Sequence, residues 1–250
     1  MQDVLTDSFL IQKYGTSKMV NYKLIIGLGF AKANIEYDDL LSKRLLAISG
    51  RDELGREDFV YYILNKLCES SLDYPIEITV IDDEKGSLSF CRDNPAINGY
   101  FTDKEDAWDV IDRTFELALA RRNKKMIERN IDREPFNVVV FGGQKAPDVI
   151  AENKDTVNKF SRLVKGKEFA ELKISFIFAD VENVALTSMS NQAHIIIRNC
   201  MNTIFFENIE DIRFVDIPVQ VKNQVKDKNS VGDAFYISDG KIKRVKTVSR

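Results

Sequence analysis

The clearest chemical pattern in this sequence is a pair of glycines, Gly50 and Gly55, five positions apart. A phosphate-binding loop reads G-x-x-x-x-G-K-[S/T]: its backbone amides wrap the phosphates, its lysine neutralises their charge and its hydroxyl holds magnesium. Here the glycine spacing is kept, but Arg56 stands at the lysine position and Glu57 at the hydroxyl position. We interpret Gly50, Gly55, Arg56 and Glu57 as a vestigial nucleotide-binding (Walker A) loop.

Acidic residues in this loop work against nucleotide binding. Glu57 places a carboxylate where a neutral magnesium ligand belongs, and Asp52 and Glu53 add negative charge. Two like charges about 4 Å apart repel by roughly 1 kcal/mol in water and by more when partly buried. The same acids stabilise the N-terminus of a following helix without any ligand. Taken alone, the segment fits an ordinary strand-to-helix turn equally well.

A P-loop ATPase also needs an acidic site at the end of a neighbouring hydrophobic strand. There an Asp holds magnesium and the next acid polarises the attacking water. The matching apolar run, residues 138–141, is followed by Gly142 and Gly143, and Asp148 comes too late to replace the acids. We therefore read a degenerate Walker B motif at Gly142 and Gly143 and predict no catalytic residue.

Other polar residues carry weaker signals. His194 is the only histidine and precedes three isoleucines, which favours a structural role. Residues 82–84, and Asp180 with Glu182, follow strands and could bind a cation, but solvated turns are the favoured interpretation. The three cysteines are widely spaced and odd in number, which fits a reducing cytosol and argues against a disulfide framework or a zinc site. We predict no metal site.

Alternating strands and helices must position these residues, as in a mostly parallel sheet covered by helices. Strands are expected at residues 23–28, 44–49, 76–81, 136–141, 174–179 and 203–206. Helices are expected at about residues 53–69, near residues 157–163, and from Thr102, where Thr102 and Glu105 have capping-box spacing. Residues 234–248 predict a β-hairpin that turns at Asp239 and Gly240.

Composition indicates one globular domain and excludes several functions. The 250 residues are 44% hydrophobic, with a net charge of −3, and contain neither a membrane-spanning apolar run nor a signal-peptide pattern. The one dense basic cluster, residues 121–125, falls near the end of a predicted helix, where cations complement the helix dipole. We therefore expect no nucleic-acid partner.

With both motifs placed, the order of elements resembles the FtsK/SpoIIIE-type ATPase modules of type VII secretion coupling proteins, EssC and EccC. More narrowly, it is similar to the C-terminal module of a staphylococcal-type EssC. The resemblance covers roughly residues 22–247 and rests on the segments LIIGLGF, LLAISGRDELGRED, ITVIDDEKGSL, FNVVVFGG, ISFIFADVENV and GDAFYISDGKIKRVKTV. It implies an α/β P-loop NTPase (RecA/FtsK-like) fold with a C-terminal β-hairpin. Residues 22–250 would form a single domain after an N-terminal extension or linker, residues 1–21.

The resemblance also implies a function. The chain would be a degenerate ATPase module, a cytoplasmic part of a longer plasma-membrane protein, with little or no hydrolysis of its own. Its implied partners are WXG100-type secreted substrates, neighbouring ATPase modules of the same protein and other components of the secretion machinery. No cofactor is expected. The alternative is a module that retains ATP, with magnesium, for structural or weak catalytic purposes. A DNA-translocating motor would need a working loop and a basic surface, and the sequence has neither.

Overall fold

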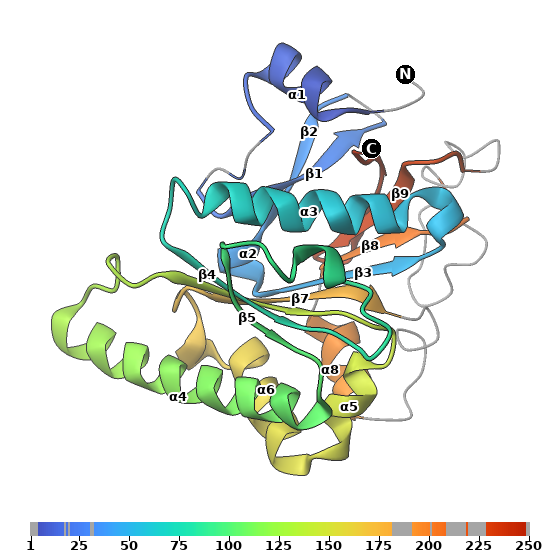
Figure 1. Cartoon of the computed structure of the whole chain (residues 1–250). Coiled ribbons are helices and arrows are strands. Elements are labelled where there is room, and N and C mark those ends of the chain that lie inside the picture. The colour runs from blue at the N-terminus through green and yellow to red at the C-terminus, as the bar shows by residue number, and fades with distance from the viewer. Residues whose placement is uncertain are drawn as a thin grey trace.

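The structure is a computed structural model that describes residues 5–17, 19, 21–30, 33–181, 192–200, 202–208, 219 and 229–248. Its strands form one ten-stranded sheet in the order β2-β1-β10-β9-β8-β3-β7-β6-β4-β5 (Figure 1). The strands are β1 Lys23–Gly29, β2 Ile35–Asp39, β3 Leu45–Gly50, β4 Ile76–Ile81, β5 Ile97–Phe101, β6 Phe136–Phe141, β7 Ile174–Val181, β8 Asn202–Phe206, β9 Asp233–Ser238 and β10 Lys241–Lys246. The helices are α1 Asp7–Tyr14, α2 Leu40–Lys43, α3 Arg56–Ser70, α4 Lys104–Glu128, α5 Ala146–Glu152, α6 Lys154–Lys165 and α8 Gln192–Cys200, with 3-10 turns η1 Asp52–Leu54, η2 Ser89–Cys91 and η3 Lys167–Phe169.

The sheet has a parallel part and an antiparallel part. Strands β8, β3, β7, β6, β4 and β5 pair in parallel. Strands β2, β1, β10 and β9 pair antiparallel with one another, and β9 joins β8 antiparallel. The predicted α/β fold with a mostly parallel central sheet is confirmed, and the antiparallel arm extends it on one side.

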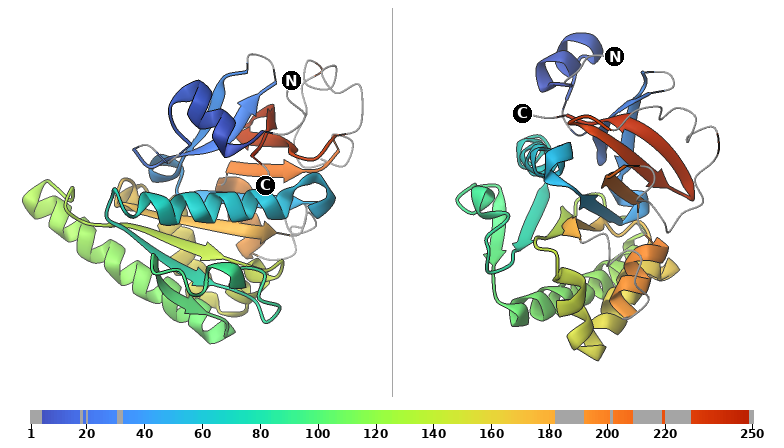
Figure 2. Two further views of the ribbon diagram at one scale, coloured as in Figure 1. Left: turned by 45° about the horizontal axis from the view of Figure 1, so that its top comes forward. Right: turned by 90° about the vertical axis from the view of Figure 1, so that its right-hand side faces the viewer.

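Helices cover both faces of the parallel part. Helix α3 lies on one face, while α4, α5, α6 and α8 lie on the other (Figures 1 and 2). In β6, Val138 and Val140 belong to the core under α3, whereas Val139 and Phe141 belong to the core under α4 and α6. This burial on both faces explains why the predicted central strands read as continuous apolar runs.

The C-terminal hairpin forms as predicted. Strands β9 and β10 pair with Ser238 opposite Lys241, and Asp239 and Gly240 lie between them with φ of 51° and 70°. Positive φ at both central residues is the geometry of a two-residue type I′ turn, which suits the right-handed twist of the flanking strands.

The predicted capping box at the start of α4 is wrong. The helix begins at Lys104, its N-cap is Asp103, and no side chain caps it. Sequence reading missed β5, which runs to Phe101 and directly precedes this helix. Thr102 and Asp103 are therefore used to turn the chain out of the strand, and both are exposed.

The N-terminal segment contacts the core. Leu5 and Leu10 are buried in the same hydrophobic cluster as residues of α3. The division into an extension, residues 1–21, and a domain, residues 22–250, stays a prediction. Across the part of the chain that the structure describes, every helix is too short or too polar to cross a membrane.

Candidate nucleotide-binding site

Residues 50–57 connect β3 to α3, as the sequence predicts for a phosphate-binding loop. Gly50 ends the strand with φ of 114°, and a Cβ atom there would lie 2.4 Å from the backbone oxygen of Phe206. Gly55 has φ of 94° and caps α3. The backbone path therefore requires glycine at both positions, whatever the loop binds.

Several amides of this loop donate hydrogen bonds within the protein. The N–H of Arg51 donates to the oxygen of Phe206 at 2.8 Å. In the 3-10 turn η1, the N–H of Leu54 donates to Arg51 at 3.1 Å, and that of Gly55 donates to Asp52 at 2.8 Å. A phosphate nest needs such N–H groups to point together into open space. At these three residues they are already satisfied.

Arg56, at the lysine position, is buried in a network of ion pairs. Its Nε and Nη2 donate to Asp52 Oδ1 at 2.9 Å and 2.6 Å, and its Nη1 donates to Asp180 at the end of β7. Burial raises the pKa of the Asp180 carboxyl, and the Arg56 guanidinium opposes that shift. Glu57 is exposed in the first turn of α3, where the helix dipole favours a negative charge.

Gly142 and Gly143 lie directly after β6, beside the acids that follow β4. The β4–β6 register pairs Ile81 with Phe141, so the next residues of both strands are neighbours. A Cβ atom at Gly142 would lie 2.4 Å from Asp82 Oδ1, and one at Gly143 would lie 2.6 Å from the Cβ of Asp83. The space that an acid at either position would enter is occupied by these two carboxylates.

Asp82 contradicts the solvated-turn interpretation of residues 82–84. It is only 4% exposed and accepts four hydrogen bonds. Its donors are the N–H of Asp83, the Ser87 hydroxyl, the N–H of Leu88 and the Tyr100 hydroxyl. Three of these donors come from the loop that follows β4 and one comes from β5. The sequence of the strand alone therefore does not indicate that the carboxylate is buried.

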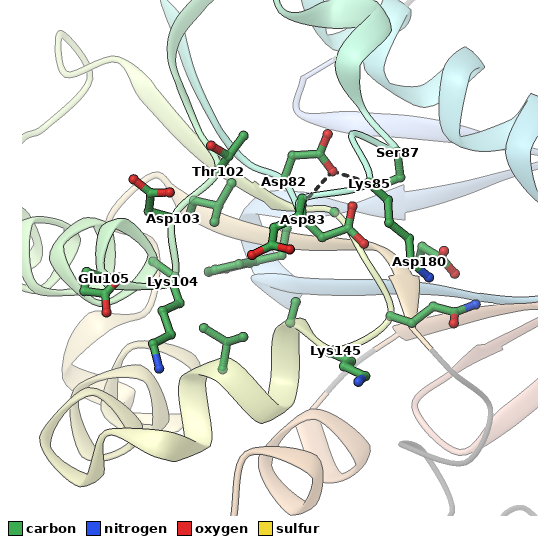
Figure 3. Close-up of a pocket in the computed structure, with 18 residues that line it drawn as sticks. Asp82, Asp83, Lys85, Ser87, Thr102, Asp103, Lys104, Glu105, Lys145 and Asp180 are labelled. Atoms are coloured by element: carbon green, nitrogen blue, oxygen red, sulfur yellow. Dashed lines mark hydrogen bonds between the residues drawn. The ribbon is translucent and has the colours of Figure 1, made fainter.

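A cavity of about 680 Å³ opens beside this carboxylate (Figure 3). It lies at the carboxyl ends of β4 and β6, between the starts of α4 and α5. None of residues 50–57 lines it, but Asp180, which does, also contacts Arg56 of the predicted loop.

The remaining sequence candidates have structural roles. His194 on α8 is buried, with its Nε2 3.3 Å from Asp148 Oδ1 on α5, so it ties two helices together. In the basic cluster, Arg121 is buried and its guanidinium donates to the backbone oxygens of Leu172, Lys173 and Pro135. Among the residues described, no group of three or more metal-ligating side chains forms a metal site. Glu182 lies outside the described residues.

Comparison with known proteins gives structural matches only. Neither a protein-family model nor a curated protein sequence matches this chain. EssC (ATPases 2 and 3) from Geobacillus thermodenitrificans matches with a TM-score of 0.78 and 12% identity, over 100% of this chain and 45% of that one. Thermomonospora curvata EccC (ATPases 2 and 3), in complex with a signal sequence peptide, matches with a TM-score of 0.71 and 13% identity, over 100% and 44%. The pCW3 conjugation coupling protein TcpA, in its monomer form with ATPγS, matches with a TM-score of 0.72 and 13% identity, over 100% and 70%.

This chain has the fold of these ATPases. The predicted P-loop ATPase fold is thereby confirmed, and the likeness to EssC and EccC that the sequence indicated extends over the whole chain. The chain spans less than half the length of the EssC and EccC chains it matches. At these identities the likeness shows the fold alone.

Proposed function

We propose that this chain is a degenerate ATPase module of a type VII secretion coupling protein. In this proposal it recognises secreted proteins or regulates neighbouring ATPase modules, and it hydrolyses little or no ATP. The similar EssC and EccC structures, which each contain two ATPase domains, support this assignment, as does the signal sequence peptide bound to EccC.

The observation that carries the proposal is the ion-pair network of Arg56. To reach a phosphate, the guanidinium would have to leave Asp180, whose carboxylate is largely buried. Separating a buried ion pair costs several kcal/mol because the remaining charge loses its partner. The exposed acids Asp52 and Glu57 would then face the phosphates as well. The loop is thus satisfied without nucleotide and is a poor site for a polyanion.

Calorimetric titration with ATP and magnesium tests this proposal. We expect no saturable heat at concentrations up to about 1 mM, the range of weak binding. A variant with Asp52→Asn and Glu57→Thr removes two negative charges and should gain measurable affinity. The matched control, Asp93→Asn with Glu128→Gln, removes two exposed charges elsewhere and should gain none. Micromolar binding by the unaltered chain, together with measurable ATP hydrolysis, would overturn the proposal.

The proposed partners are WXG100-type secreted substrates, neighbouring ATPase modules and other components of the secretion machinery. The module would face the cytosol, as part of a longer protein anchored in the plasma membrane. A pull-down with the chain as bait should retain helical-hairpin secreted proteins and release versions that lack their signal sequence. Equal retention of both versions would contradict signal recognition.

A second candidate is a module that keeps ATP as a structural ligand. It is favoured by the position of Arg56 at the first turn of α3, because guanidinium groups pair well with phosphate oxygens. The similar TcpA structure was solved with ATPγS. This candidate predicts that ATP at 100 times its Kd stabilises the fold by about 2.7 kcal/mol and so raises the Tm. An unchanged Tm at millimolar ATP would count against it.

A further inference from the structure

The cavity at the carboxyl ends of β4 and β6 lies outside the predicted nucleotide loop. Its volume of about 680 Å³ is in the range of small-molecule sites. Residues from the ends of β4 and β6 form one side, and residues from the first turns of α4 and α5 form the other (Figure 3).

We propose that this cavity binds an organic cation, an ammonium or guanidinium group on an apolar stem. The lining contains twice as many carboxylates as lysines. Its acids are Asp82, Asp83, Glu84, Asp103, Glu105 and Asp180. Its lysines are Lys85, Lys104 and Lys145. A concave site lined by an excess of one charge focuses the field and attracts the opposite charge.

The acidic side chains of the lining differ in how many hydrogen bonds or ion pairs they form within the protein. Asp82 has its four hydrogen bonds, and Asp180 is paired with Arg56. Asp83 is different: its Oδ1 is buried, and within the described part of the chain it has no hydrogen-bond partner. An unsatisfied buried carboxylate oxygen is costly, and the Asp83 side chain that carries it is only half-buried and lines the cavity. A turn of this side chain would bring the oxygen to a cationic donor in the cavity and remove that cost.

The cavity also has an apolar wall that suits a short stem. It is formed by Phe141 and Ile81, from the two strand ends, and by Val149 and Ala146 of α5. Binding sites of this kind combine an apolar body with a few convergent polar groups that fix the orientation of the ligand. The acids would hold the charged head, and this wall would hold the stem.

The lysines only partly neutralise the site. Lys104 is engaged elsewhere: its Nζ lies 3.1 Å from Glu152 Oε2 and over the ring of Trp108. Lys145 precedes α5 and is exposed at the cavity. A triphosphate would meet the acids of this cavity directly, so the chemistry of the site is opposite to that of a nucleotide pocket.

The cation could come from a free amine or from a lysine or arginine side chain of a peptide. Both sources present the same head and stem. The inference does not use the proposed function, since none of residues 50–57 lines the cavity, although Asp180 of its lining pairs with Arg56.

Trp108, the only tryptophan, provides a built-in reporter. Its indole N–H donates to the backbone oxygen of Val149, a lining residue, at 2.8 Å. Titration with agmatine, a guanidinium on a four-carbon stem, should change the fluorescence of Trp108 saturably. Pentanol and pentanoate, which keep the stem but lack the cation, should not. Saturable binding of pentanoate with equal affinity, or no response to agmatine up to about 10 mM, would overturn the proposal.

Charge variants test the named residues. Asp83→Asn should weaken agmatine binding by about tenfold, the loss of one charge-assisted hydrogen bond. Glu84 is exposed, and Glu84→Gln should weaken binding several-fold. Lys145→Met should strengthen it. The control Glu128→Gln lies at the other end of α4, about 35 Å from Glu105 at the rise of an α-helix, and should change nothing.

Equal affinities for the Glu84→Gln, Lys145→Met and Glu128→Gln variants would contradict the assignment, even if Asp83→Asn failed to fold. The source of the cation is then decided by comparing agmatine with the capped peptide acetyl-Ala-Arg-Ala-amide. Tighter binding of the peptide indicates a basic side chain, and tighter binding of agmatine indicates a free amine.

Discussion

Asp38 lies in β2 with its carboxyl group fully buried. Its Oδ2 accepts hydrogen bonds from Asn202 Nδ2 at 2.7 Å and from the Tyr236 hydroxyl at 2.8 Å, so it joins β2 to β8 and β9. Burial is the main cause that raises its pKa from 3.8 to about 6, while the two hydrogen bonds oppose the shift. The protonated acid is therefore the better-tolerated form in the folded protein.

Asp38 should make the stability of the fold depend on pH. Because its folded pKa exceeds the unfolded value of 3.8, its stabilising effect is complete below about pH 4 and is lost as the pH rises through about 6. A shift of this size corresponds to about 3 kcal/mol. Urea unfolding at about pH 4.5 and about pH 7.5 should show about 2 kcal/mol of this loss for the unaltered chain and much less for Asp38→Asn. The exposed control Asp93→Asn should behave like the unaltered chain. Parallel pH profiles for all three proteins would contradict the prediction.

The Arg56–Asp180 pair should be strongly coupled. Both side chains are largely buried, at 10% and 16% exposure. Arg56→Met should lower the free energy of unfolding by about 3 kcal/mol, since it leaves the Asp180 carboxylate without its cation. Adding Asp180→Asn should recover part of that loss. A double-mutant cycle from urea unfolding gives the coupling, and additive effects of the two substitutions would show that the pair is not formed.

At the scale of elements, the parallel register of β4 and β6 limits which residue types fit directly after each strand. Asp82 and Asp83 on one side and Gly142 and Gly143 on the other share a single space. An acid introduced after β6 would therefore meet existing carboxylates as well as lacking room. Placing an acidic motif after β6 would require changing both strand ends together.

Gly142→Ala tests this packing. The added Cβ would lie 2.4 Å from Asp82 Oδ1 and 2.8 Å from the Leu88 side chain, so we expect a loss of about 1–3 kcal/mol from overpacking. Gly240→Ala is the control: no atom lies within 4 Å of its Cβ, and only its φ of 70° opposes the substitution. Its cost should be about 1 kcal/mol, the penalty of a left-handed residue. Urea unfolding of both variants measures the difference, and a smaller loss for Gly142→Ala would contradict the shared-space account.

The sequence predicted some elements and missed others because only some of them have a recognisable local sequence pattern. Strand β6 and the hairpin at Asp239 and Gly240 were predicted because an apolar run and a turn pair are local features. Strand β5 was missed because Asn98 and Gly99 interrupt its apolar pattern. The ion pair between Arg56 and Asp180 joins residues 124 positions apart, so only the folded sheet brings them together.

At the scale of the whole molecule, helix α1 is part of the packing around α3. Leu5 and Leu10 belong to the same core as Phe59, and Asp7 pairs with Lys66 at 2.5 Å. Each fully buried leucine contributes roughly 1.5–3 kcal/mol relative to an exposed one. These contacts argue that the first segment stabilises the rest of the chain.

Deletion of residues 1–14 should therefore lower the free energy of unfolding by about 3–6 kcal/mol, the contribution of two buried leucines. Urea unfolding followed by far-UV circular dichroism measures it. The double substitution Ile11→Ser and Lys13→Ser, at two exposed positions of the same helix, is the control and should have little effect. An unchanged midpoint after the deletion would support residues 22–250 as an independent domain.

Leu5 and Val248 form a parallel β-bridge, so segments from opposite ends of the sequence lie side by side. A mechanical load applied at these two residues acts first on this bridge. The load reaches the strands of the sheet only after the bridge opens. While the bridge is intact, a force that pulls Leu5 and Val248 apart would therefore be carried by the bridge and not by the strands of the sheet.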